Sequence, residues 1–253
     1  MISLLSHTGP QVPRPGRYQQ LTVRNAQEDN SEIIKALSVI RYNNLLNDLM
    51  LLNYYNGMPI SFGAAVEHID NGIVVMAVHS FQAVSMMMQN MTFIKSTLFP
   101  HWVLANVLKV DRENNLAYLA LFSFVHNPSD RRMHVRMKLP EAVEASFQSG
   151  SQEVPGAVRE ISFGGVALLA PQQKPLKERE KGIVSLLLPD DKLDIPGVFL
   201  QCQDVDSQKR HIFQLKMNTR SKQIFSDFIY QQQSKIMGEL QKMSAESKEI
   251  EEA

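Results

Sequence analysis

Residues 156–169, which read GAVREISFGGVALL, decide how this chain is expected to fold. Two runs that suit β-strands, residues 156–162 and 166–169, flank a turn that contains Gly164 and Gly165. Alternating apolar and polar residues are typical of a half-buried strand, and glycine is typical of the turn between two strands. The stretch therefore predicts two short strands joined by a tight turn.

The same rhythm continues through the second half of the chain. Further strands are expected around residues 142–147, 183–188, 198–203 and 211–217. Turn residues such as Pro155-Gly156 and Pro189-Asp190-Asp191 separate them. Short strands at even spacing with such turns predict an antiparallel barrel or sandwich, not a parallel α/β sheet.

A helix is expected to follow from about Ser221. Its apolar face predicts packing on the second set of strands and consists of Ile224, Phe225, Phe228 and Ile229. Apolar residues also recur every seven positions, at 229, 236, 243 and 250, as they would in a coiled-coil seam. Residues 236–253 are expected to be a charged helical tail, which is either solvated or part of a homodimer.

The first half predicts one helix and a second set of strands. An N-cap at residues 29–31, followed by apolar residues at helical spacing, predicts a helix that ends near Asn56-Gly57. Asp70-Asn71-Gly72 predicts a hairpin, because Asn-Gly accepts the positive φ angles of a type I′ turn. More strands are expected at residues 92–99, 102–110 and 116–125. The run Met86-Met87-Met88 is compatible with either helix or strand.

The sequence breaks at residues 126–130, His-Asn-Pro-Ser-Asp, and this break divides the chain. We expect a flexible arm at residues 1–28, a first domain at 29–126 and a linker at 127–136. A second domain is expected at 137–235, before the tail at 236–253.

The composition of the chain argues against several classes of protein. Lys plus Arg and Asp plus Glu number 26 each, so no net charge draws the chain to nucleic acid or to a membrane. The single cysteine, Cys202, cannot form an internal disulfide and indicates a reducing cytoplasm. The start of the chain has no charged region before a short apolar run, which predicts no signal peptide. No run approaches the ~20 apolar residues of a membrane span.

A cluster of cations lies in and just after the expected linker: Arg131, Arg132, His134, Arg136 and Lys138. Residues four apart, such as Arg132 and Arg136, point roughly the same way in a strand or a helix. Each guanidinium can hold a phosphate through two parallel hydrogen bonds or lie flat on a purine ring. The cluster therefore predicts a site for a phosphate-bearing anion.

The expected strand at residues 156–162 adds a second part to this site. Alternation places Glu160 and Ser162 on one face and Ile161 on the other, so that one face can serve a ligand and the other the core. Gly164 and Gly165 are expected to make a positive-φ turn, and their missing Cβ atoms would leave room for a flat ring.

Taken in order, Arg132-x-x-x-Arg136 and Glu160-x-Ser162-x-x-Gly165 resemble the PilZ domain, the bacterial receptor module for cyclic di-GMP. The pattern of that family is R-x-x-x-R followed by D/N-x-S-x-x-G. The resemblance covers about residues 127–235 and implies a six-stranded barrel with a C-terminal helix. The upstream half resembles, in architecture alone, the N-terminal split-barrel domain of the flagellar-brake type of two-domain PilZ protein. The expected fold is therefore mostly β, with two antiparallel barrel domains, an N-terminal helix and a C-terminal helix.

The resemblance implies a second-messenger receptor. Its arginines would hold the phosphates and guanine edges of cyclic di-GMP, and the hairpin would line a guanine. The expected ligand-binding residues are Arg131, Arg132, Arg136, Glu160, Ser162, Gly164 and Gly165. Glu160 departs from the Asp or Asn of the family: it keeps the acceptor but adds a methylene. Binding would switch the arrangement of the two domains and so regulate a protein partner in motility, biofilm or exopolysaccharide output.

Two other functions fit the same residues. One is a protein-interaction scaffold that has lost nucleotide binding, which Glu160 favours. The other is a nucleic-acid binder that uses the patch from Arg131 to Lys138; neutral net charge and the lack of nearby aromatic residues count against it. Nucleophile-elbow, Walker and dinucleotide-binding motifs do not occur, and one cysteine without paired histidines gives no zinc spacing. We therefore expect no enzyme, no metal, no nucleic acid and no membrane span.

Overall fold

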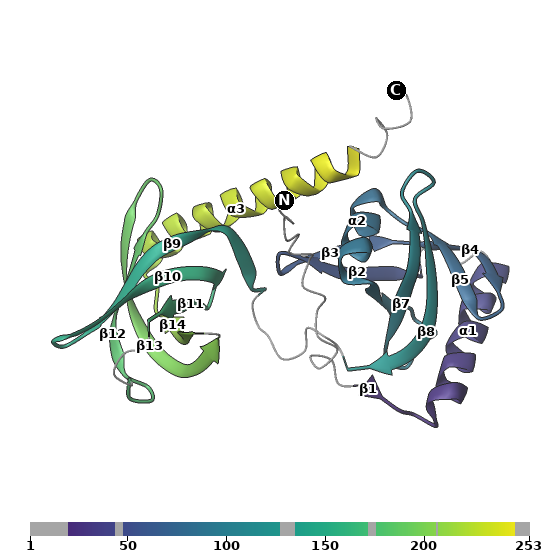
Figure 1. Cartoon of the computed structure of the whole chain (residues 1–253), viewed down its shortest axis with the longest axis horizontal. Coiled ribbons are helices and arrows are strands. Elements are labelled where there is room, and N and C mark those ends of the chain that lie inside the picture. Colours follow the sequence, from purple (N-terminus) through teal and green to yellow (C-terminus); the bar gives the residue numbers. More distant parts are fainter. Residues whose placement is uncertain (1–19, 44–47, 127–134, 172–175, 206, 246–253) are drawn as a thin grey trace, which may run out of the picture. The chain divides into compact units, whose positions relative to one another are not determined.

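The computed structural model describes residues 20–43, 48–126, 135–171, 176–205 and 207–245, and it divides the chain into two compact units. Within these ranges both units are antiparallel sheets, accompanied by helices α1, α2 and α3 (Figure 1). The prediction of a mostly β chain with a helix near each end is confirmed. Most of the expected arm and the last part of the expected tail lie outside the described residues.

The first unit is an eight-stranded sheet in the order β3-β2-β6-β7-β8-β5-β4, with β1 paired to β8. Its strands are β1 (Gln20–Leu21), β2 (Met50–Tyr55), β3 (Met58–Gly63), β4 (Ala65–Asp70), β5 (Ile73–Ala77), β6 (Met91–Lys95), β7 (Trp102–Asp111) and β8 (Leu116–Val125). The sheet curves into a half-barrel (Figure 1). Helix α1 (Ala26–Tyr42) contacts β4 and β8, and α2 (Ser80–Gln89) contacts β2, β6 and β7. Both helices bury apolar side chains against the sheet.

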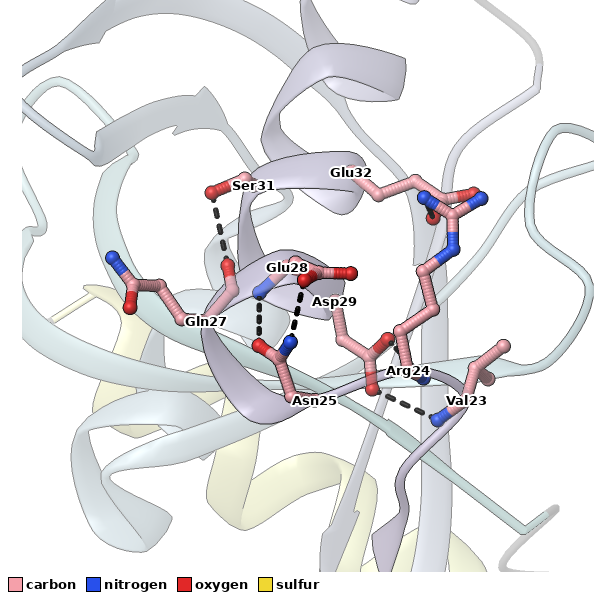
Figure 2. A network of polar contacts seen from close by, with 8 residues as sticks. All are labelled: Val23, Arg24, Asn25, Gln27, Glu28, Asp29, Ser31 and Glu32. Atoms are coloured by element: carbon pink, nitrogen blue, oxygen red, sulfur yellow. Dashed lines mark hydrogen bonds and ion pairs between the residues drawn. The ribbon is translucent and has the colours of Figure 1, made fainter.

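Helix α1 begins earlier than the sequence indicated, because Asn25 caps it (Figure 2). The Asn25 side chain accepts a hydrogen bond from the Glu28 N–H at 2.9 Å and donates one to the Glu28 carboxylate at 2.6 Å. This reciprocal pair is similar to a capping box, except that Glu28 accepts from the Asn25 side-chain amide and not from its backbone N–H. Buried Asp29, from the expected cap, instead accepts the backbone N–H groups of Val23 and Arg24 at 2.9 and 3.0 Å. The expected N-cap at residues 29–31 is therefore wrong.

The expected end of this helix near Asn56-Gly57 is also wrong. Helix α1 ends at Tyr42, and the later leucines of the predicted helix lie in and before β2, where Leu49 and Leu51 are buried. Asn56 and Gly57 have φ angles of 48° and 80° and form the tight turn between β2 and β3. Asn71 and Gly72, with φ angles of 47° and 81°, form the same kind of turn between β4 and β5, so the predicted hairpin is confirmed.

A buried amide cluster ties α2 to the sheet; we define it as Asn53, Gln82, Gln89 and Thr92. The Asn53 amide nitrogen donates to the Gln89 side-chain oxygen at 2.7 Å and to a backbone carbonyl of β6 at 2.6 Å. The Asn53 oxygen accepts from Gln82 at 2.5 Å and from the Thr92 hydroxyl at 2.7 Å. Asn53 itself is 0% exposed. The methionine run that the sequence left open is helical and belongs to α2.

The second unit is a closed six-stranded barrel in the order β10-β11-β14-β13-β12-β9. Its strands are β9 (Met137–Ser149), β10 (Gln152–Ser162), β11 (Gly165–Ala170), β12 (Lys181–Leu187), β13 (Lys192–Val205) and β14 (Gln208–Leu215). Every strand predicted in this half is present. Of the two predicted arrangements, a barrel and a sandwich, the structure shows the barrel. The buried rings of Phe147 and Phe213 lie 4.5 Å apart. Helix α3 (Thr219–Ala245) follows and buries Phe225, Phe228 and Ile229 of its predicted apolar face.

Candidate functional site

A β-bulge in β10 turns the candidate residues toward the outside of the barrel. The pairing of β10 with both neighbouring strands shifts between Val158 and Glu160. Relative to β11, Arg159 is an extra residue in β10, whereas relative to β9 the extra residues lie on β9, between Lys138 and Val143. Val158 and Ile161 are both buried, at 0% and 2% exposure, although they are three residues apart. Strict alternation would have put Glu160 on the same face as Val158. The bulge therefore leaves Glu160 and Ser162 half-buried on the outer face.

The turn after β10 differs from the expected one. Ser162 pairs with Gly165 in the register, and its hydroxyl donates a hydrogen bond to the Gly165 carbonyl at 3.2 Å. Among the described glycines, φ is positive at Gly57, Gly72 and Gly150, and not at Gly164 or Gly165. The expected positive-φ turn is therefore wrong.

Gly165 is needed for a different reason. A Cβ atom there would lie 2.2 Å from the Phe213 carbonyl oxygen of β14, which is far inside van der Waals contact. The missing side chain lets β14 approach β11 at the edge where the hairpin turns. The β10–β11 turn also contacts α3, since the rings of Phe163 and Tyr230 meet edge to face at 6.4 Å.

The start of β9 lies beside this hairpin. Met137 pairs with Ile161 and Lys138 pairs with Glu160. Arg136 is the residue directly before Met137, so the register brings it to the same end of the barrel as Ser162. Arg136 is exposed. The structure thus brings together Arg136, Glu160, Ser162, Gly164 and Gly165, whereas Arg131 and Arg132 lie outside the described residues.

One residue of this surface was missed from the sequence. Arg210 of β14 forms an ion pair with Glu160, joining its Nη2 to the carboxylate Oε2. Its Nη1 also donates to the Gln203 side-chain oxygen of β13 at 3.3 Å. The Arg210 and Glu160 side chains are 16% and 27% exposed. No sequence signal marks Arg210, because the contact joins residues 50 positions apart and depends on the strand order of the closed barrel.

The neighbour of Arg210, His211, points the other way, into the barrel. It is 3% exposed and packs near the rings of Phe199 and Phe213, with centroid distances of 5.8 and 6.4 Å. Within the described part of the chain, neither ring nitrogen has a hydrogen-bond partner. Burial lowers the pKa of His211 below its ordinary value, and the nearby charge of Lys209 lowers this pKa further. The imidazole is therefore held neutral inside the barrel.

The outer face has the chemistry of a polar binding surface. Guanidinium groups of Arg136 and Arg210 supply donors, and the Glu160 carboxylate and Ser162 hydroxyl supply acceptors. No group of three or more His, Cys, Asp or Glu residues within the described ranges is placed to hold a metal ion. Nor is any helix of those ranges both long and apolar enough to cross a membrane.

Comparison with known proteins identifies the second unit. Residues 130–231 match the PilZ domain family, and this match indicates no catalytic family. No curated protein matches the chain.

Among solved structures, the chain is similar to YcgR in complex with c-di-GMP from Escherichia coli. The two are 10% identical, with a TM-score of 0.42, over 87% of this chain and 99% of that one. The Bacillus subtilis inhibitor of motility MotI/DgrA is 12% identical, with a TM-score of 0.41, over 75% and 96%. The K. pneumonia MrkH–c-di-GMP complex is 15% identical, with a TM-score of 0.37, over 80% and 96%. Likeness at this level carries no argument about function, which depends on the residues of the barrel and the family match.

Proposed function

We propose that this chain, whose residues 130–231 match the PilZ domain family, is a bacterial receptor for cyclic di-GMP. One observation carries the proposal. The register of β9 with β10 places Arg136 at the end of the barrel where the bulge turns Glu160 and Ser162 outward. Arg136, from the first part of the motif, thus lies at the same end of the barrel as Glu160 and Ser162 from the second part.

Each residue has a proposed role. Arg132 and Arg136 hold the two phosphates and the guanine edges, and Arg131 adds a third cation near the phosphates. Glu160 and Ser162 offer acceptors to a guanine base on the outer face of the barrel. Gly164 and Gly165 carry no side chain that would block a flat ring.

Ligand binding would also act on the connection between the two units. The arginines precede β9 in the chain, so a ligand that holds them restrains this connection. Such a ligand shifts the equilibrium between domain arrangements only by its different affinity for them. We propose that this shift regulates an unidentified protein partner in motility, biofilm or exopolysaccharide output, and that the chain is not an enzyme. The single cysteine, which is free and exposed, favours a cytoplasmic location.

The Glu160–Arg210 ion pair favours a second candidate, a PilZ-like interaction scaffold that does not bind nucleotide. In the structure this carboxylate already has a partner. If the pair only joins strands, the acceptor that a guanine needs is occupied.

Calorimetric titration separates the two candidates. Wild type, Arg132→Ala and Arg136→Ala are titrated with cyclic di-GMP, cyclic di-AMP and GTP. Each arginine variant should bind cyclic di-GMP about ten- to a hundredfold more weakly, because a charge-assisted hydrogen bond is lost. Arg24→Ala, which removes an exposed arginine of the first unit, should bind as wild type does. A wild type that gives neither heat nor a thermal shift would support the scaffold.

Small-angle scattering tests the switch separately. The scattering curve should change when saturating cyclic di-GMP is added to the full chain. Identical curves with and without ligand would discard the switch, even where calorimetry shows binding.

A further inference from the structure

The Glu160–Arg210 pair reaches across a strand. Glu160 lies on β10 and Arg210 on β14, and β11 runs between them. Neighbouring strands are about 4.8 Å apart, so the two backbones are separated by about 9.6 Å. The strand between them has Ala167 opposite Glu160. Arg210 lies opposite Leu169 of the same strand, so the two side chains reach toward each other diagonally across β11.

The length of Glu160 matters for this contact. An aspartate is one methylene shorter and would not reach the same guanidinium from the same backbone position. The glutamate that departs from the family pattern is therefore explained by its partner, and the two residues form one unit.

The guanidinium is held from a second side. Arg210 also donates to Gln203 on β13, so its orientation is fixed by partners on both flanking sides. A guanidinium fixed in this way still has N–H donors left, since it carries five. Lys138, which pairs with Glu160 in the register, adds a further cation on the same outer face.

We propose that Arg210 is a specificity-determining residue of the ligand site and that it reads guanine together with Glu160. This inference rests on the proposed function. Arginine binds the O6 and N7 acceptors of guanine with two parallel hydrogen bonds. The carboxylate accepts from the adjacent N1–H and amino donors of the same base. Adenine has a donor where guanine has O6, so the pair rejects adenine.

Titration of barrel variants tests this. Wild type, Arg210→Gln, Arg210→Lys and Glu160→Asp are titrated with cyclic di-GMP and cyclic di-AMP, and the melting temperature of each variant is recorded. Arg210→Gln should weaken cyclic di-GMP binding about ten- to a hundredfold and leave cyclic di-AMP binding unchanged. Arg210→Lys keeps the charge but loses the planar fork, so the preference for guanine should fall here too.

Glu160→Asp gives the sharpest contrast. It restores the family pattern, which alone would predict equal or tighter binding. Because aspartate cannot reach Arg210, we expect weaker binding and a smaller preference for guanine. The double variant Glu160→Asp/Arg210→Gln should lose little more than either single variant, since the two residues act as a pair.

Lys209→Gln is the matched control. It removes one positive charge and one ion pair, with Asp204, from the residue next to Arg210. It should bind both nucleotides as wild type does.

The outcomes separate the two proposals. If wild type binds cyclic di-GMP and the Arg210 variants keep the full preference for guanine, the pair is structural and the inference fails, while the proposed function stands. If wild type does not bind, the proposed function fails first, and the inference fails with it.

Discussion

The two units use their polar side chains in opposite ways. In the first unit, the buried amide cluster faces inward and ties α2 to β2 and β6. In the second, Glu160, Ser162 and Arg210 lie on the outer face of a barrel whose interior is largely apolar. Most polar groups inside a protein form hydrogen bonds with one another, whereas groups on an outer face can exchange their partners for a ligand. The first unit therefore uses these groups for stability, and the second keeps them accessible.

The largest expected loss of stability comes from a substitution in the buried amide cluster. Asn53→Ala removes four hydrogen bonds at once and leaves buried groups of Gln82 and Thr92 without that partner. We expect the free energy of unfolding of the first unit to fall by about 3 kcal/mol or more, since each unsatisfied buried group costs about 1–3 kcal/mol. Denaturant unfolding followed by circular dichroism measures this loss.

Asn106→Ala is the control, because Asn106 is an exposed asparagine on β7 of the same sheet. It should change the stability by less than about 0.5 kcal/mol. Affinity for cyclic di-GMP should be unchanged in both variants at a temperature where they are folded. Equal losses in the two variants would show that the amide cluster does not stabilise the unit.

A somewhat smaller effect is expected at the edge of the barrel. Gly165→Ala places a Cβ atom against the Phe213 carbonyl, so β14 must move. The second unit should lose about 2–3 kcal/mol, the upper part of the range for overpacking. Thermal unfolding measures this loss. Gly238→Ala in α3 should instead gain up to about 1 kcal/mol, because no atom beyond the neighbouring backbone of the helix itself lies within 4 Å of the added carbon. Equal behaviour of both variants would mean that β14 does not need this glycine.

The smallest effect concerns His211, a titratable residue whose side chain lies inside the barrel. Its pKa is lowered in the folded state, so the unfolded chain takes up a proton first as the pH falls below the ordinary histidine value of 6.5. The stability of the second unit should therefore be full above pH 6.5 and decrease as the pH falls through the folded-state pKa. Each unit by which the pKa is lowered corresponds to about 1.4 kcal/mol.

Unfolding curves of wild type and His211→Leu between pH 7.5 and 5.5 measure this effect. The variant should lose less stability on acidification, because it has no group to protonate at this position. If the stability of both proteins changed with pH in the same way, protonation of His211 would not be the cause of the loss of stability at low pH.

The sequence predicted the second unit better than the first for a physical reason. Barrel strands alternate and end at Pro, Gly and Asp turns, so their positions follow from local chemistry. In the first unit, leucines around residues 49–52 fit a helix as well as a strand, and pairing with β6 decides for the strand. The Met86–Met88 run was ambiguous for a similar reason, because contact with the sheet determines it.

Some residues of the candidate site could be predicted from the sequence, and others could not. Glu160 and Ser162 were found from a local pattern, and Ile161 was expected in the core, where it lies. Arg210 could not be found, because it meets Glu160 only through the order of the strands. The role of Gly165 was predicted wrongly, because its requirement for glycine comes from the close approach of β14 and not from the turn itself.

The extra residue at Arg159 makes β10 tolerant of one change in length and sensitive to another. Removing that amino acid would restore plain alternation, with Val158 and Ile161 still inside the barrel and Glu160 and Ser162 still outside. Inserting one residue between Ile161 and Ser162 would instead turn the Ser162 side chain toward the apolar interior. In this strand, the position of a one-codon insertion or deletion therefore decides whether the motif keeps its outer face.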